Sequence, residues 1–168
     1  MTIARATPAD VQALLEVDVL LTTRVRQNEI LEDSVRSGGC FIARCDAMLA
    51  GFITWDLGFF QRPFVRLLVV VTSARRRGIG RALLERAELD ATPHGQLFVS
   101  TESINAPMQA LLLSLAYTPS GSIDHINAPG NPELVYYKPL PHHPATYKHP
   151  ISSSSRRRSN LTTATMKP

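Results

Sequence analysis

Apolar residues recur along the chain in two spacings, one typical of strands and one typical of helices. Short runs rich in β-branched and aromatic residues predict strands over residues 39–44, 49–57, 64–71, 96–101, 120–125 and 133–138. Asp46-Ala47 is expected to form a tight turn, and residues 58–63 a longer one.

Segments whose apolar residues have helical spacing lie before these runs and between them. Thr7 is a favourable N-cap, and the proline after it predicts a helix through Val11 and Leu14, followed by a second helix over residues 27–35. A third helix is predicted where Ile79, Leu83, Leu84 and Ala87 share one face, and a fourth where Met108, Leu111, Leu112 and Leu115 do. The order, a meander and then alternating helices and strands, predicts the α+β class with a mixed sheet.

Length and charge predict one domain and an extension. Of 168 residues, residues 1–140 carry the apolar periodicity, whereas residues 141–168 are rich in Pro, Ser, Thr and His and are expected to be disordered. The whole chain has a formal net charge of +4. Residues 141–168 hold five cations and no acid, so residues 1–140, the body of the protein, have a net charge of −1. A near-neutral body argues against a protein that coats nucleic acid. The basic serine-rich cluster of the tail is better explained as part of a solvated extension than as a localisation or modification element.

Cysteine content and hydropathy give further expectations. Cys40 and Cys45 are five apart in one predicted strand, so their side chains point to opposite faces and are expected to be reduced thiols. No metal site is expected. No apolar stretch approaches the roughly 20 residues that cross a bilayer, and the N-terminus does not resemble a signal peptide, so a cytoplasmic protein is expected. A homodimer is left open.

The turn between residues 71 and 79 carries the clearest chemistry. It leads from a buried strand into a helix, whose first N–H groups lack partners and attract an anion such as phosphate. Gly78 and Gly80 allow close approach of the ligand to the backbone. Arg81 follows where a P-loop needs lysine, and Leu83 stands at the third glycine of a dinucleotide fingerprint, so neither motif is present.

Arg75-x-x-Gly78-x-Gly80 instead resembles the acetyl-CoA diphosphate loop of the GNAT family of N-acetyltransferases. The segment from Asn105 to Tyr117 resembles that family's second signature, in the expected order. The resemblance covers roughly residues 2–140. It implies a GNAT-like fold, with a central, mostly antiparallel, splayed sheet flanked by helices.

The resemblance also implies acetyl-CoA as co-substrate and an amine as acceptor. Asn105 is equally well explained as a helix N-cap. The residues implied to contact the coenzyme are Val69, Val70, Val71, Arg75, Arg76, Arg77, Gly78, Ile79, Gly80, Arg81 and Asn105.

Catalytic groups are harder to assign, because the chain departs from the family pattern. Leu112 replaces the tyrosine that protonates the departing thiolate in many members, and Ala116 replaces a glycine. Asp56 and Glu102 are the preferred candidate proton acceptors, with Asp124 and His125 as alternatives, and each is also explained as an exposed residue without a catalytic role. The expected activity is transfer of an acetyl group to a primary amine of a small molecule or protein by direct attack. The alternatives are a CoA-binding module without catalysis and an interaction protein acting through its tail.

Overall fold

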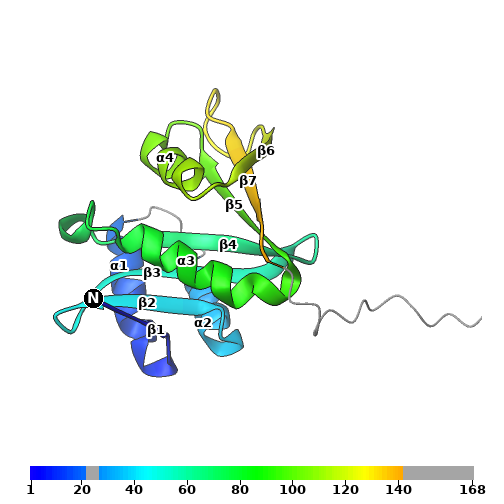
Figure 1. Ribbon diagram of the computed structural model, residues 1–168. Helices are drawn as coiled ribbons and strands as arrows, with labels where there is room; N and C mark the ends of the chain where they lie inside the picture. The colour runs from blue at the N-terminus through cyan, green and yellow to red at the C-terminus, as the bar shows by residue number, and fades with distance from the viewer. Residues whose placement is uncertain (22–26, 142–168) are drawn as a thin grey trace, which may run out of the picture.

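The computed structural model describes residues 1–21 and 27–141, and within them seven strands form one sheet in the order β1-β2-β3-β4-β5-β7-β6 (Figure 1). Every neighbouring pair is antiparallel except β4 and β5. The expected α+β class with a mostly antiparallel sheet is therefore confirmed. The strands are β1 Thr2–Arg5, β2 Cys40–Cys45, β3 Met48–Phe59, β4 Arg62–Val70, β5 Gln96–Glu102, β6 Thr118–Ile123 and β7 Glu133–Pro139.

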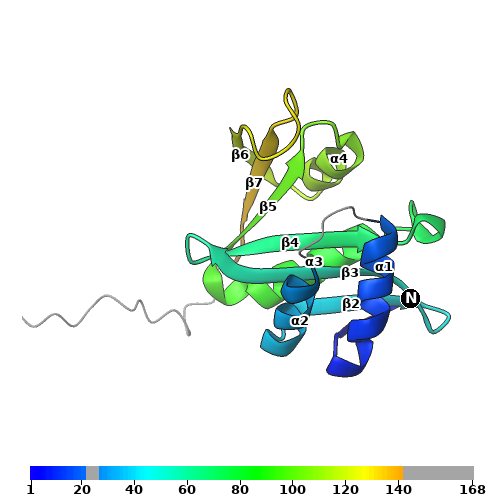
Figure 2. The ribbon, with the colours of Figure 1, turned by 180° about the vertical axis from the view of Figure 1, so that it is seen from behind.

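Helices cover both faces of the sheet. Helices α3 and α4 lie in front of it in Figure 1, and Figure 2 shows α1 and α2 on the opposite face. Short 3-10 turns at Pro8–Asp10, Thr72–Ala74 and Thr92–His94 adjoin α1 and flank α3. The helices are α1 Val11–Leu21, α2 Gln27–Ser37, α3 Ile79–Ala91 and α4 Ala106–Ser114.

Two hydrophobic cores result from the alternation of side chains along the central strands. Phe41 and Ile53 are fully buried in the core that includes α3 and α4. Ile42 and Phe52, one residue away in each strand, are buried in the core that includes α1 and α2. Because successive strand residues point to opposite faces, continuous apolar runs in β2 and β3 are what a doubly covered sheet requires.

The sheet splits between β4 and β5. These strands pair only at Phe64↔Phe98 and Val65↔Val99, and Figure 1 shows them diverging beyond that point. The remaining length of β4 therefore has β3 as a partner on one side and no strand of the described chain on the other. This confirms the splayed sheet that the family resemblance implies.

One predicted loop is wrong. The turn expected over residues 58–63 is a two-residue turn at Phe60 and Gln61, with φ of 49° and 59°, so β3 continues to Phe59. The turn at Asp46 and Ala47 is as predicted, and Cys40 and Cys45 are free thiols. Residues 142–168 of the predicted tail lie outside the described residues. Among the described helices, none is long and apolar enough to cross a bilayer.

Candidate functional site

The N-terminus of α3 presents a run of unpaired backbone donors. The first bond of the helical ladder is from the Ala82 N–H to the Gly78 carbonyl, at 3.0 Å, and no side chain caps the helix. Within the described chain, the N–H groups from Arg76 to Arg81 have no hydrogen-bond acceptor. Consecutive free N–H groups at the positive end of a helix dipole form a site for a phosphate group.

The two glycines keep this helix end accessible. Gly78 has φ of 80°, in the left-handed region that disfavours side chains, and a Cβ there would meet nothing within 4 Å. A Cβ on Gly80 would lie 3.4 Å from Leu111 Cδ2 and 3.7 Å from Val70 Cγ2. The absence of a side chain at Gly78 thus leaves open space at the N-terminus of α3, and its absence at Gly80 leaves a narrow space between β4 and α4.

The arginines of this loop divide into two groups. Arg75 Nε donates to the Val70 carbonyl at 3.1 Å, and Arg81 Nη2 donates to Ser114 Oγ at 2.7 Å, which ties α3 to α4. Arg76 and Arg77 are exposed, and Arg76 has φ of 62°, a strained backbone conformation for a residue with a side chain. Arg76 and Arg77 are therefore the cations best placed to reach an anion in front of the helix.

Fewer of the predicted residues of β4 expose their backbone groups at its open edge than the sequence indicates. The Val71 N–H donates to the Ala50 carbonyl at 3.0 Å, and Val69 lies opposite Phe52, so the backbone groups of both face β3. Since backbone direction alternates along a strand, the groups of Leu68 and Val70 face the gap toward β5. Leu68 was missed by the sequence reasoning, because strand register is a long-range property.

A cleft lies on the face of the sheet that α2 covers, beside a bulge in β4. Thr54 pairs with Leu67 and Trp55 with Val65, so Arg66 is an extra residue and both Arg66 and Leu67 face the cleft. The cleft has a volume of about 400 Å³, within the range of small-ligand pockets. Its apolar lining consists of Ile30, Phe59, Phe64, Leu67, Ile123, Ile126 and Val135.

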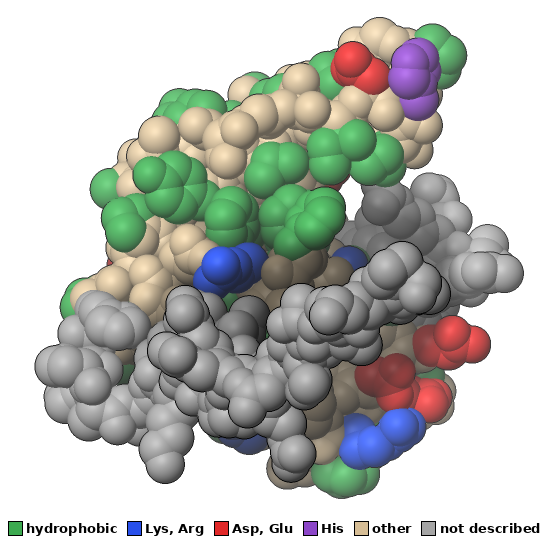
Figure 3. All heavy atoms as spheres, turned by 90° about the vertical axis from the view of Figure 1, so that its right-hand side faces the viewer, with side chains coloured by type: hydrophobic (Ala, Val, Ile, Leu, Met, Phe, Trp, Pro, Cys, Tyr) green, Lys and Arg blue, Asp and Glu red, His purple; other side chains and the backbone are tan. Residues whose placement is uncertain are grey.

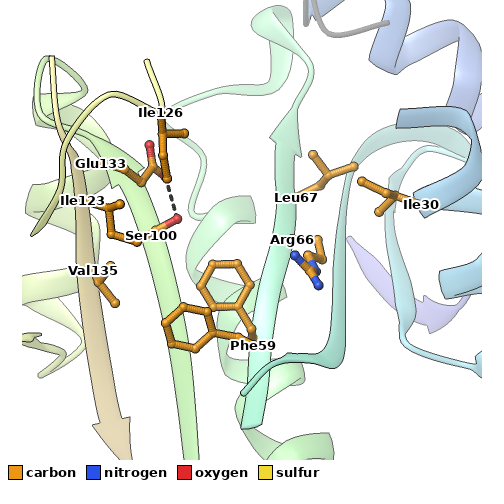
Figure 4. Close-up of a pocket in the computed structure, with 10 residues that line it drawn as sticks. Ile30, Phe59, Arg66, Leu67, Ser100, Ile123, Ile126, Glu133 and Val135 are labelled. Atoms are coloured by element: carbon orange, nitrogen blue, oxygen red, sulfur yellow. Dashed lines mark hydrogen bonds between the residues drawn. The ribbon is translucent and has the colours of Figure 1, made fainter. Parts of the chain in front are cut away.

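The cleft has two walls, one from β5, β6 and β7 and one from β4 and α2, and Phe59 of β3 lies between them (Figure 4). Phe59 and Phe64, which both line the cleft, stack with ring centroids 4.8 Å apart. Trp55 packs against His94, with ring centroids 5.9 Å apart, and Phe60 is exposed at the turn. Figure 3 shows several hydrophobic side chains on the upper part of one side of the molecule.

Two charged residues and a serine line this cleft. Glu133, at the start of β7, accepts hydrogen bonds from Ser100 Oγ at 2.5 Å and from Asn127 Nδ2 at 2.8 Å. Arg66 lies on the opposite wall in Figure 4, and its Nε donates to Asp56 Oδ2 at 2.9 Å. The sequence reasoning missed Glu133, whose only sequence signal is an acidic residue at the start of an apolar strand.

The two predicted proton acceptors lie near the cleft without lining it. Asp56 also accepts from the Gly58 N–H at 2.6 Å, so both of its oxygens have partners. Glu102 lies directly opposite Glu133 in the β5–β7 ladder, and its Oε2 accepts from Asn131 Nδ2 at 2.8 Å. Both lie on strands that line the cleft, Asp56 on β3 with Phe59 and Glu102 on β5 with Ser100.

The second sequence signature forms α4. Asn105 caps this helix, its Oδ1 accepting from the Met108 N–H at 3.3 Å, so the predicted N-cap is confirmed. Leu112 is fully buried in the core. Burial, together with the neighbouring Glu88, raises the pKa of the nearby Tyr117 hydroxyl, which keeps that phenol neutral. Tyr117 is itself buried in this core.

These features agree with comparisons to known proteins. The model of the acetyltransferase (GNAT) family matches residues 12–117, and the chain therefore belongs to this family. No curated protein matches the sequence. The prediction of an acyltransferase of the GNAT family is confirmed.

Solved structures share the fold. A GNAT-family acetyltransferase from Bacillus cereus ATCC 10987 has 26% identity and a TM-score of 0.76, with 83% of this chain and 96% of that chain covered. The ribosomal-protein-alanine N-acetyltransferase from Brucella melitensis has 24% identity and a TM-score of 0.70, covering 83% of this chain and 100% of that chain. The yncA protein of Salmonella typhimurium, solved with its cofactor acetyl-CoA, has 21% identity and a TM-score of 0.71, with 88% of this chain and 98% of that chain covered.

Proposed function

We propose that the protein transfers the acetyl group of acetyl-CoA to a primary amine by direct attack within a ternary complex. The proposal rests on the positions of the N-terminal end of α3 and of the apolar cleft, which lie on either side of the gap between β4 and β5. The donor-rich end of α3 adjoins the unpaired edge of β4, and the apolar cleft lies on the other face of β4 and β5. A thioester in the gap would be within reach of an amine in the cleft.

The chain's own groups suit the two ends of acetyl-CoA. The six N–H groups from Arg76 to Arg81 would bind the diphosphate, with Arg76 and Arg77 adding charge-assisted hydrogen bonds. The backbone of Leu68 would pair with the pantetheine arm. Because the Val71 N–H is bonded to Ala50, the Val70 N–H is the donor that would stabilise negative charge on the thioester oxygen.

The amine must lose a proton before it attacks. A lysine-type amine has a pKa of about 10.4 and is mostly protonated near neutrality, so a proton acceptor is needed. We favour Glu102 over Asp56 for this role, acting through water, because Glu102 lies directly opposite the cleft residue Glu133 in the β5–β7 ladder. As the C–N bond forms and the C–S bond breaks, the nitrogen loses its second proton, and coenzyme A leaves as a thiolate that takes up this proton through water. A thiol of pKa about 8.5 leaves without a dedicated acid, so Leu112 does not prevent turnover.

The test is a broad screen of primary amines with acetyl-CoA, with release of coenzyme A thiol as the readout. The proposal predicts thiol release that depends on the amine and is accompanied by acetylation of the amine, detected by mass spectrometry. Binding of acetyl-CoA without amine-dependent release across the screen would instead identify a CoA-binding module without catalysis.

A further inference from the structure

The acceptor cleft contains a carboxylate whose charge is not balanced by a cation of the described chain. Glu133 lines the cleft, and the residues around it on its own wall are Ser100 and the apolar Ile123, Ile126 and Val135 (Figure 4). The ion pairs formed by residues 1–21 and 27–141 do not include Glu133. A carboxylate in apolar surroundings is costly unless hydrogen bonds and a positive charge stabilise it.

Two neutral donors fix the orientation of this carboxylate without neutralising it. Ser100 Oγ donates to Oε1 at 2.5 Å, and Asn127 Nδ2 donates to Oε2 at 2.8 Å. Each carboxylate oxygen can accept a second hydrogen bond, so both retain the capacity to bind a further donor. The carboxylate is thus held in one orientation and still able to bind a ligand.

The opposite wall does not supply the missing charge. Arg66 is the other charged residue that lines the cleft, and its Nε forms an ion pair with Asp56 Oδ2 at 2.9 Å. The Arg66 guanidinium also stacks over the Phe64 ring, 5.5 Å from its centroid. With Arg66 balanced by Asp56, the net charge of the cleft is negative.

We propose that Glu133 is the ammonium-binding residue of the acceptor site, and that the acceptor is a cationic primary amine with an apolar or aromatic group beside the nitrogen. This inference rests on the proposed function. Ser100 and Asn127 act as positioning residues, and the apolar lining binds the substituent. A neutral acceptor, or one with a carboxylate next to its amine, would bind poorly because it would leave Glu133 unpaired or repel it.

A direct binding experiment tests the inference without any acyl donor. The full chain is titrated calorimetrically with 2-phenylethylamine and with 2-phenylethanol, which is similar in size but neutral. The amine should bind about 10- to 100-fold more tightly, the range that a charge-assisted hydrogen bond supports. Glu133→Gln should remove most of this difference. Equal affinities in the wild-type protein, or no binding of the amine, would overturn the proposal.

Kinetics with an amine identified in the screen separates recognition from chemistry. Glu133→Gln should raise KM for the amine about 10- to 100-fold, whereas Glu133→Asp, which keeps the charge, should recover part of the loss. Glu32→Gln, at an exposed carboxylate of α2, is the matched control and should leave KM unchanged. A large fall in kcat with KM unchanged would overturn the binding role. Failure of the wild-type protein to acetylate any amine would count against the proposed function, while the binding result would still decide the role of Glu133.

Discussion

Replacing Gly80 with valine should abolish acetyl-CoA binding while the protein stays folded. A Cβ at this position lies 3.4 Å from Leu111 Cδ2 and 3.7 Å from Val70 Cγ2, which are ordinary contact distances. The two methyl groups of valine extend further, so they fill the space between β4 and α4 where the coenzyme would lie. If two hydrogen bonds to phosphate are lost, at about 1.5–3 kcal/mol each, the dissociation constant rises about 10²- to 10⁴-fold.

Gly80→Ala is the matched control. Its single methyl group makes only those ordinary contacts, and alanine is about 1 kcal/mol more favourable than glycine in a helix, so the melting temperature should rise by about 2–4 °C. Calorimetric titration with acetyl-CoA and thermal unfolding should be measured on both variants. If folded Gly80→Val binds acetyl-CoA with wild-type affinity, the coenzyme does not use this space and the reasoning is refuted.

Three further predictions concern stability and reactivity. Ala116 has φ of 62°, a conformation that costs a residue with a side chain about 1–2 kcal/mol, so Ala116→Gly should raise the melting temperature by about 2–4 °C; no rise would contradict the strain. Burial raises the pKa of the Cys40 thiol to about 12, so iodoacetamide at pH 8 should modify Cys45 first and Cys40 only after unfolding, as mass spectrometry of the peptides would show. Partial burial lowers the pKa of His94 below its usual 6.5. The neutral side chain therefore contributes stability above pH 6.5, and this contribution is lost as the pH falls from 6.5 through the lowered pKa. The melting temperature of the wild type should therefore fall toward that of His94→Gln between pH 7 and pH 5, and a constant difference would contradict this.

The elements that the sequence predicts well are those set by local periodicity. Ile79, Leu83, Leu84 and Ala87 are all buried on one face of α3, as their spacing indicates, because helical amphipathicity is visible within a dozen residues. The diglycine loop was located for the same reason, since its glycines, strand and helix are contiguous. Turn chemistry was less informative, because Phe60 and Gln61 adopt positive φ without the glycine or asparagine that usually marks such a turn.

Features set by strand pairing could not be read from the sequence. The cleft joins Ile30 of α2 with Ser100 of β5 and Glu133 of β7, which are distant in the sequence. The bulge at Arg66 and the alternation that directs Leu68 and Val70 into the gap depend on the register of β3 with β4. The role of Glu133 therefore became visible only once Ser100 and Asn127 were seen to hold its carboxylate.

The central claim is that the free backbone donors at the start of α3 bind the diphosphate of coenzyme A. Its most direct test is a titration of the isotopically labelled protein with coenzyme A, followed by the amide resonances in nuclear magnetic resonance spectra. The account predicts the largest downfield shifts at the N–H groups from Arg76 to Arg81, as each gains a charge-assisted hydrogen bond. Saturable binding of coenzyme A that leaves these six resonances unmoved would contradict it.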